Sequence, residues 1–240
     1  MNKIEQLQDI FDKSNKIVFF TGAGVSTESG IPDFRSTDGL YNQYYAYPPE
    51  KIISHSFFQS NPKEFYRFYK EKMLYPQANP NPAHFKMAEF EKSGKSLGVI
   101  TQNIDGLHQK AGSKNVYELH GTVKKNYCTI CNKFYDLNYI LNNTDIPHCS
   151  CGGIIKPDVV LYEEALDEEI LYNACNTIRN ADCLVICGTS LVVWPAAGLV
   201  NYFNGKYLVV LNLSSTSSDE NSDLVINGKV GEILNNIKVR

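Results

Sequence analysis

Residues 16–26 read KIVFFTGAGVS, and this stretch decides the fold class. A run of Ile, Val and Phe without polar alternation is typical of a parallel strand that is covered on both faces. The run leads into Gly22-Ala23-Gly24, a Gly-x-Gly turn in which the backbone can approach a phosphate-bearing ligand closely. The stretch therefore predicts a buried strand with a ligand-binding turn at its carboxyl end.

Further apolar segments of the same character follow along the chain. They are LGVIT at 97–101, CLVIC at 183–187, YLVVL at 207–211 and, as an edge strand, DLVIN at 223–227. Helical patterns lie between them at 82–92, 167–180 and 195–203. Alternating strands and helices predict an α/β fold with a doubly wound parallel sheet.

Two stretches interrupt this alternation. Residues 36–80 are rich in Tyr, Phe and Pro, and residues 122–157 carry a cluster of cysteines and the turn-prone run NNTDIPHCSCGG. We expect them to form a smaller domain made of a helical module and a cysteine-bearing module. The large domain is then expected to comprise residues 1–35, 81–121 and 158–240.

The composition is that of an ordinary folded protein, with 43% hydrophobic and 20% charged residues among 240. A net charge of -3 argues against nucleic-acid binding, which usually requires a basic face. No apolar run reaches the length of about 18 residues that spans a membrane, and the N-terminal segment lacks the apolar stretch of a signal peptide. The sequence thus predicts a cytoplasmic protein that requires neither nucleic acid nor a membrane as a partner.

Four of the seven cysteines form two close pairs. The pairs are Cys128 with Cys131 and Cys149 with Cys151. Four thiolates at this spacing can close a tetrahedral Zn²⁺ site, which is structural because no coordination position stays open. The competing interpretations are disulfides, which the absence of a secretory signal disfavours, and inert thiols. His148 is an alternative ligand beside the second pair.

Polar residues also follow the later core strands. They lie in TQNIDGLH at 101–108, GTS at 188–190 and NLS at 212–214. Because ligands bind outside the carboxyl ends of strands in open α/β sheets, these segments predict one shared pocket. His120, within ELHG, is a candidate base because an unperturbed pKa of about 6.5 suits proton abstraction at neutral pH, although a structural histidine is the alternative.

In this order, GAGVSTESGIPDFRS, TQNIDGLH, ELHG, C-x2-C…C-x-C, PDVVLYEE, GTSLVVWPAA and NLSSTSSD resemble the motifs of the sirtuin family, from residue 16 to the C-terminus. Their combination and order are specific to that family, and within it the chain resembles bacterial NAD-dependent protein deacetylases. The resemblance implies a Rossmann-type large domain and a small domain made of a zinc ribbon and a helical module. NAD and acyl-lysine would meet in the cleft between them, and one structural Zn²⁺ would be bound per chain.

The resemblance also assigns roles to individual residues. His120 would be the catalytic base, Asp105 would accept a hydrogen bond from the nicotinamide carboxamide, and Phe34 would shield the nicotinamide end. The residues expected to bind NAD are Ala23, Thr27, Phe34, Arg35, Gln102, Asn103, Ile104, Asp105, His120, Gly188, Thr189, Ser190, Asn212 and Val230. The residues expected to bind substrate, by pairing with its main chain as an added strand, are Val159, Val160, Leu161 and Tyr162.

The implied reaction converts acetyl-lysine and NAD to lysine, nicotinamide and O-acetyl-ADP-ribose. NAD is therefore a co-substrate, and acetylated proteins or peptides are the partners. The acyl oxygen would attack C1′ of the nicotinamide ribose as nicotinamide leaves, and His120 would then help to deprotonate a ribose hydroxyl that attacks the acyl carbon. Water would complete the release of lysine and O-acetyl-ADP-ribose. The motifs leave the oligomeric state open and are compatible with a monomer.

Two segments differ from patterns known in the family. The usual Phe-Gly-Glu is Tyr162-Glu163-Glu164 here, and the added negative charge predicts a preference for basic residues beside the acyl-lysine. Desuccinylase-type members grip an acidic acyl group with a Tyr-x-x-Arg pair, whereas this chain has Tyr66 but carries Tyr69 at the arginine position. We therefore expect deacetylation, or removal of longer uncharged acyl groups, rather than desuccinylation.

Three other functions stay open at the level of sequence. Mono-ADP-ribosyl transfer could occur on the same fold. An NAD(P)-dependent oxidoreductase is disfavoured because Thr27 takes the place of the third glycine of G-x-G-x-x-G. A zinc-ribbon module that binds nucleic acid is disfavoured by the acidic charge balance.

Overall fold

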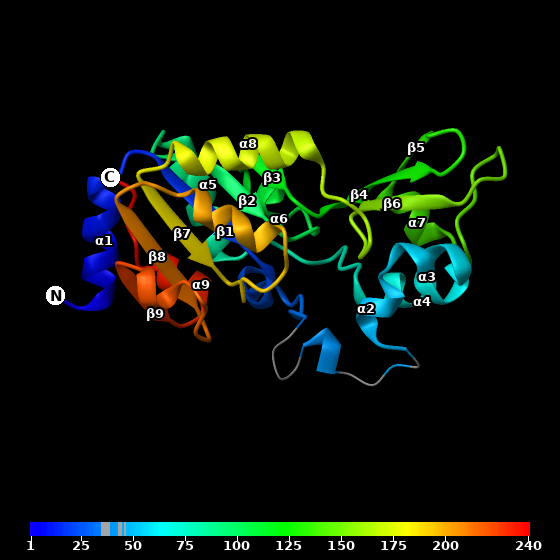
Figure 1. Cartoon of the computed structure of the whole chain (residues 1–240), viewed down its shortest axis with the longest axis horizontal. Coiled ribbons are helices and arrows are strands. Elements are labelled where there is room, and N and C mark those ends of the chain that lie inside the picture. The colour runs from blue at the N-terminus through cyan, green and yellow to red at the C-terminus, as the bar shows by residue number, and fades with distance from the viewer. Residues whose placement is uncertain (35–38, 43–44, 46) are drawn as a thin grey trace.

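The computed structural model describes residues 1–34, 39–42, 45 and 47–240. Its main feature is a parallel sheet of six strands in the order β3-β2-β1-β7-β8-β9 (Figure 1). β1 lies inside the sheet and pairs in parallel with β2 on one side and β7 on the other. The strands are β1 Ile17–Thr21, β2 Ser96–Thr101, β3 Val116–Glu118, β7 Cys183–Cys187, β8 Tyr207–Asn212 and β9 Leu224–Asn227. The predicted edge strand is confirmed as β9, and the opposite edge is the short β3.

Helices cover both faces of this sheet, which explains the uninterrupted apolar strands. Ile17 and Phe19 of β1 pack into one hydrophobic cluster, while Val18 and Phe20 pack into another on the opposite face. The first cluster is completed by α1 Lys3–Lys13, α5 Pro82–Lys92 and α9 Val230–Asn235. The second is completed by α8 Glu168–Arg179 and the 3₁₀ helix η4 Ala196–Tyr202. The predicted doubly wound α/β fold is confirmed.

Local sequence signals set the starts of the helices. Asn81 precedes Pro82 at the start of α5, and its side chain accepts a hydrogen bond from the Ala83 N–H at 2.9 Å. Asparagine caps the free N–H groups of a first turn, and proline at the first position has no N–H to leave unpaired. The same Asn-Pro pair begins α4 Pro62–Lys72. The predicted helix at 195–203 is present as the 3₁₀ helix η4, and the ring of Trp194, just before it, lies too close to Gly198 for a Cβ at that position.

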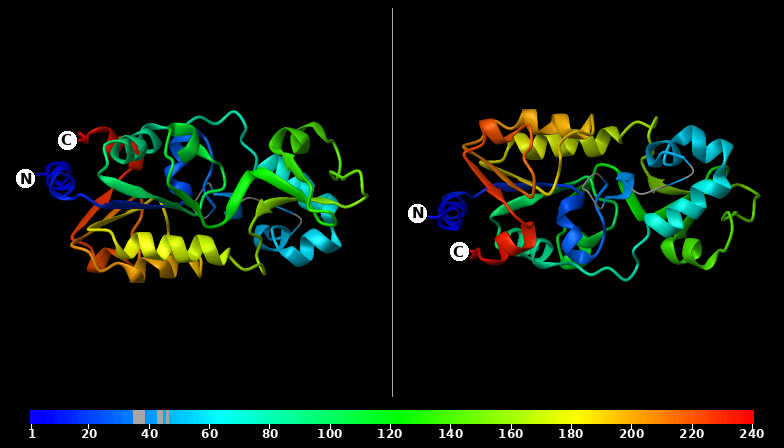
Figure 2. Two further views of the ribbon diagram at one scale, coloured as in Figure 1. Left: turned by 90° about the horizontal axis from the view of Figure 1, so that it is seen from above. Right: turned by 90° about the horizontal axis from the view of Figure 1, so that it is seen from below.

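A second, three-stranded antiparallel sheet lies at the other end of the molecule from both termini (Figure 1). Its strands, in the order β5-β4-β6, are β5 Phe134–Asp136, β4 Gly121–Cys128 and β6 Ile155–Val159. It shares one hydrophobic cluster with the neighbouring helices, and two of the four clustered cysteines are buried in that cluster. The helices of this end are α2 Pro49–Ile52, α3 His55–Ser60, α4 and α7 Leu137–Asn142. Figure 2 shows the same separation of the two sheets from above and below.

Short helical turns occupy several of the connecting loops. They are η1 Ala23–Val25, η2 Thr27–Ser29, η3 Leu40–Asn42, α6 Leu107–Ala111 and η5 Asp219–Asn221. None of the helices in the described part of the chain has the length and apolar character that crossing a bilayer requires.

Candidate functional site

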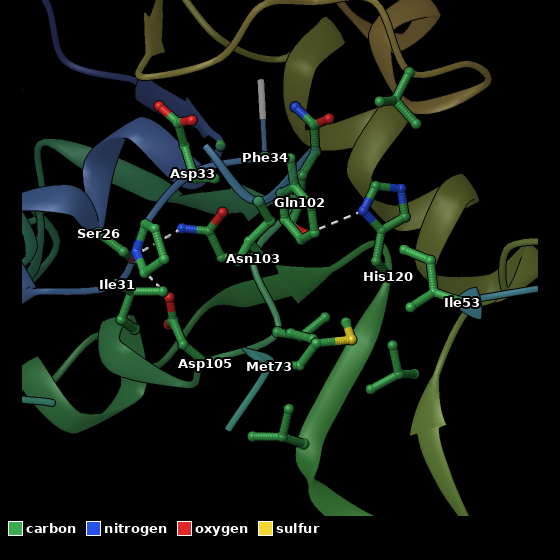
Figure 3. Close-up of a pocket in the computed structure, with 18 of the residues that line it drawn as sticks. Ser26, Ile31, Asp33, Phe34, Ile53, Met73, Gln102, Asn103, Asp105 and His120 are labelled. Atoms are coloured by element: carbon green, nitrogen blue, oxygen red, sulfur yellow. Dashed lines mark hydrogen bonds between the residues drawn. The ribbon is translucent and has the colours of Figure 1, made fainter. Parts of the chain in front are cut away.

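A cavity of about 700 Å³ lies where the carboxyl ends of the large sheet's strands meet the small sheet and its helices. The loops after β1, β2, β7 and β8 all contribute to its lining, as the polar strand ends predicted. Segment 159–164 and side chains of the helical module form the facing wall. Figure 3 shows Ser26, Asn103 and Asp105 together on one side of the cavity and His120 on the other.

The Gly-x-Gly turn joins two of these loops. The Gly22 N–H donates to Cys187 O at 3.1 Å, and the Gly24 N–H donates to Gly188 O at 2.8 Å. A Cβ on Gly24 would lie 2.8 Å from Gly188 Cα, and Gly188 itself has a φ of +56°. Both positions therefore require glycine, because the two backbones touch at the edge of the cavity.

A hydrogen-bonded cluster of Ser26, Asn103 and Asp105 connects the loops after β1 and β2. The Ser26 hydroxyl donates to Asp105 Oδ2 at 2.7 Å and accepts a hydrogen bond from Asn103 Nδ2 at 3.1 Å. Burial raises the pKa of Asp105 above its ordinary value, although hydrogen bonds from the Leu107 N–H and the Ser26 hydroxyl oppose this. The cluster thus presents an amide and a largely enclosed carboxyl group to a ligand.

His120 lies in the turn between β3 and β4. Its Nδ1 is 3.0 Å from the carbonyl oxygen of Gln102, and a carbonyl can only accept a hydrogen bond. Nδ1 therefore carries the proton, and Nε2 is left as the basic atom of the ring. Burial lowers the pKa of His120 below its ordinary value, and the hydrogen bond to Gln102 opposes this shift. A neutral imidazole with a defined tautomer suits a general base at neutral pH.

The loops after β7 and β8 are tied to the loop after β2 by side-chain hydrogen bonds. Gln102 Nε2 donates to Thr189 Oγ1 at 2.9 Å. Asn212 Nδ2 donates to Thr189 O at 3.2 Å and to Ser214 O at 2.8 Å. These four residues line the same cavity as Gly188 and Ser190, so the strand ends form one continuous polar surface.

Some of the predicted residues lie elsewhere. Thr27 donates to Gly24 O at 3.0 Å, and Val230 is packed in the hydrophobic cluster at the start of α9. Neither belongs to the lining that the described residues form. Arg35 lies outside the described residues. The other residues expected to bind NAD line the cavity, and they are Ala23, Phe34, Gln102, Asn103, Ile104, Asp105, His120, Gly188, Thr189, Ser190 and Asn212.

The facing wall contains both predicted and unpredicted residues. Val159, Val160, Leu161 and Tyr162 all line it, as expected for a substrate-binding segment. The Val160 N–H donates to the His120 carbonyl oxygen at 3.0 Å, which holds this segment beside the histidine. Ile53 and Met73 of the helical module were not predicted (Figure 3). They lie in no recognisable motif, and only the tertiary packing brings them to the cavity. Ser26 could have been found, because it lies in the same polar loop as the Gly-x-Gly turn.

The four clustered cysteines converge in the small sheet. The sulfur atoms of Cys128 and Cys151 are 3.4 Å apart, those of Cys131 and Cys149 are 3.5 Å apart, and all four lie within 4.8 Å of one another. A disulfide requires about 2.05 Å, whereas a zinc tetrahedron with Zn–S bonds of about 2.3 Å has edges of about 3.8 Å. The four thiols therefore fit a structural zinc, and His148 is not among the clustered groups.

Known proteins with similar sequences identify the family to which this site belongs. The sequence profile of the Sir2 family matches residues 22–195. The chain is 56% identical over 240 residues to the NAD-dependent protein deacetylase of Clostridium perfringens, covering 98% of each chain. It is 53% identical over 241 residues to the protein of the same name from Clostridium acetobutylicum, covering 99% of this chain and 98% of that one.

Solved structures agree. A Sir2 structure with a deacetylated p53 peptide and 3′-O-acetyl ADP-ribose is similar with a TM-score of 0.91 at 40% identity, covering 98% of this chain and 97% of that one. A Sir2 structure with a p53 peptide and NAD⁺ is similar with a TM-score of 0.86 at 41% identity, and the match covers 97% of this chain and 96% of that one. The chain belongs to the Sir2 family.

Proposed function

We propose that this protein is an NAD-dependent protein deacetylase that converts acetyl-lysine, NAD and water to lysine, nicotinamide and O-acetyl-ADP-ribose. The proposal rests on the position and tautomer of His120. Its Nε2 is the basic atom of the ring, and the residue lines a cavity formed by four polar strand ends and by segment 159–164. The names of the two Clostridium relatives and the peptide and NAD⁺ in the Sir2 structures support it.

The strand ends supply the binding groups for NAD. Asp105 and Asn103 would hold the nicotinamide carboxamide, because a carboxylate oxygen can accept from its NH₂ and an amide can donate to its carbonyl. Ser26 fixes both side chains through its hydroxyl group. The loops at Gly188–Ser190 and Asn212 would hold the adenosine side, and Thr27, Arg35 and Val230 remain proposed contacts.

His120 would accept a proton at Nε2 from a ribose hydroxyl once nicotinamide has left. The Gln102 carbonyl keeps the proton on Nδ1 and stabilises the imidazolium that forms. A positioned base of this kind contributes about 10²–10⁴-fold to the rate. NAD supplies the ribose that carries the acyl group away, so it is consumed in each turnover.

Segment Val159–Tyr162 would lie beside the substrate main chain as an added strand, a mode that depends mainly on backbone hydrogen bonds. The N–H groups of Val160, Leu161 and Tyr162 already donate within the protein, so the pairing would use other main-chain groups of this edge. The preference for one acyl group over another is proposed from residues of the helical module. Tyr66 and Tyr69 are buried in the aromatic core of that module, and neither belongs to the cavity lining formed by the described residues. Without an arginine at position 69 we expect acetyl peptides to be turned over faster than succinyl peptides; the reverse order would contradict this.

The domain division proposed from the sequence is supported by the two separate sheets. Residues 36–80 and 122–157 would form the small domain, with the zinc site as its structural centre. Residues 1–35, 81–121 and 158–240 would form the NAD-binding domain. A cytoplasmic location also remains a proposal.

The proposal is tested by incubating the protein with an acetyl-lysine peptide and NAD, and following products by mass spectrometry and absorbance. Deacetylation matched one-to-one by nicotinamide release, with no NADH absorbance, is the expected result. NADH formation would instead indicate an oxidoreductase. ADP-ribose attached to protein, without loss of the acetyl group, would indicate a mono-ADP-ribosyltransferase.

A further inference from the structure

Glu163 has an unusual backbone conformation at the mouth of the cavity. Its φ is +76°, in the left-handed region that residues other than glycine, asparagine and aspartate seldom adopt. Glu163 lines the cavity directly after Val159–Tyr162, the proposed peptide-binding segment. A strained residue at a binding site persists only where surrounding contacts hold it, so those contacts indicate its role.

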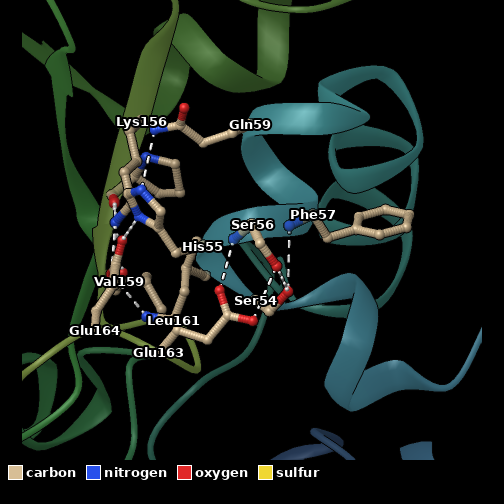
Figure 4. Close-up of polar contacts among 11 residues, drawn as sticks. Ser54, His55, Ser56, Phe57, Gln59, Lys156, Val159, Leu161, Glu163 and Glu164 are labelled. Atoms are coloured by element: carbon tan, nitrogen blue, oxygen red, sulfur yellow. Dashed lines mark hydrogen bonds and ion pairs between the residues drawn. The ribbon is translucent and has the colours of Figure 1, made fainter.

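The Glu163 side chain reaches across to the helical module. Oε2 accepts a hydrogen bond from the Ser56 N–H at 2.8 Å, and Oε1 accepts one from the Ser56 hydroxyl at 2.9 Å (Figure 4). Both carboxylate oxygens are thus occupied by one residue of α3. The carboxylate is directed toward Ser56 and its charge is partly compensated by two donors.

The neighbouring residues brace the same segment. The Tyr162 N–H donates to Ile53 O at 3.0 Å, and the His55 N–H donates to Tyr162 O at 3.0 Å. The Glu164 carboxylate contacts His55 Nδ1 at 2.8 Å and Lys156 Nζ at 3.0 Å. Segment 162–164 is therefore held to α3 and β6 by main-chain and side-chain contacts together.

The main chain of Glu163 lies at an exposed position in the lining of the cavity. Its N–H and C=O make no hydrogen bond to any residue in the described part of the chain. The side-chain contact with Ser56 fixes the direction in which these two groups face. We propose that Glu163 is a positioning residue, which anchors its own backbone on Ser56 so that the N–H and C=O can pair with the substrate main chain. This inference rests on the proposed deacetylase function.

The role differs from a charge effect on peptide selection. Glutamine at 163 removes the charge but can still accept from the Ser56 N–H and exchange a hydrogen bond with the hydroxyl. Glycine removes the anchor and at the same time relieves the left-handed strain. The two substitutions therefore separate anchoring from both charge and strain.

The test measures KM for an acetyl-lysine peptide, KM for NAD, kcat and Tm in the 240-residue chain with zinc bound. Glu163→Gly is expected to raise the peptide KM about threefold to tenfold, with KM for NAD unchanged and Tm equal or higher. Glu163→Gln is expected to keep the peptide KM within about twofold of the wild type. Ser56→Ala should fall between them, because its N–H still donates. Glu50→Ala, an exposed glutamate on α2, is the matched control and should change nothing.

Each outcome decides the question. An unchanged peptide KM in Glu163→Gly overturns the positioning role. If the peptide KM rises equally in Glu163→Gln and Glu163→Gly, and only for peptides with basic neighbours, the residue acts through its charge. That result also overturns the positioning role. If Glu163→Gly raises the KM for peptide and the KM for NAD together and lowers Tm, the substitution has disturbed the fold as a whole. That result overturns the positioning role too. A wild type that releases no nicotinamide from acetyl peptide and NAD overturns the proposed function itself, and the Glu163 role with it.

Discussion

Gly24→Ala places a methyl group where the β1 and β7 loops touch. The new Cβ would lie 2.8 Å from Gly188 Cα and 2.9 Å from Gly188 O, and backbone atoms cannot rotate out of the way. The loops must therefore separate, and the 2.8 Å hydrogen bond from the Gly24 N–H to Gly188 O weakens. Overpacking costs about 1–3 kcal/mol and a lost hydrogen bond about 1 kcal/mol, so the free energy of unfolding should fall by about 2–4 kcal/mol.

Thermal unfolding followed by circular dichroism measures this loss. For a chain of this length 1 kcal/mol lowers Tm by about 2–4 °C, so we expect a decrease of about 5–12 °C. Because the same loops line the cavity, the KM for NAD should rise about tenfold or more. Gly228→Ala is the control, since its Cβ would make only an ordinary contact with Ile233 at 3.4 Å. A Tm for Gly24→Ala within about 2 °C of the wild type would refute the reasoning.

Asp105→Asn should lower kcat/KM for NAD about 10–100-fold in a nicotinamide-release assay, because an amide cannot replace a carboxylate that accepts hydrogen bonds on both oxygens; a change below about twofold would contradict its proposed contact. Cys131→Ser should lose bound zinc by atomic absorption and lower Tm, while Cys175→Ser, outside the four-cysteine cluster, should keep it; full zinc content in Cys131→Ser would count against the site. Burial lowers the pKa of His84 to about 4 and that of His108 well below its ordinary value. The unfolded state then binds protons more readily, so stability should fall as pH drops from about 6.5 toward 4, by about 2 kcal/mol between pH 7 and 5 for His84 alone. Urea unfolding at both pH values should show a smaller pH effect in His84→Gln, and an equal effect would contradict this.

The large sheet was predictable because its strands are buried on both faces. Residues such as Phe19 and Phe20 face opposite hydrophobic clusters, so the sequence shows an apolar run rather than alternation. The polar segments at the strand ends were equally visible, because parallel strands bring their carboxyl ends to one edge of the sheet. The four cysteines could be identified from spacing alone.

Other parts of the site depend on tertiary packing that no local pattern records. Ile53 and Met73 reach the cavity only because the helical module packs against strands β4 and β6. The anchoring of Glu163 on Ser56 joins residues that are 107 positions apart. The added charge of Glu163 predicts a preference for peptides with basic neighbours, and this stays a prediction. The structure adds what the sequence could not show, namely that this carboxylate accepts two hydrogen bonds from Ser56.

The measurement that tests the central proposal most directly is mass spectrometry of an acetyl-lysine peptide incubated with and without NAD, for the wild type and His120→Ala. The wild type should deacetylate the peptide only with NAD present and form O-acetyl-ADP-ribose. His120→Ala should do so about 10²–10⁴-fold more slowly while keeping its zinc. Deacetylation without NAD, or full activity in the variant, would contradict the proposed mechanism.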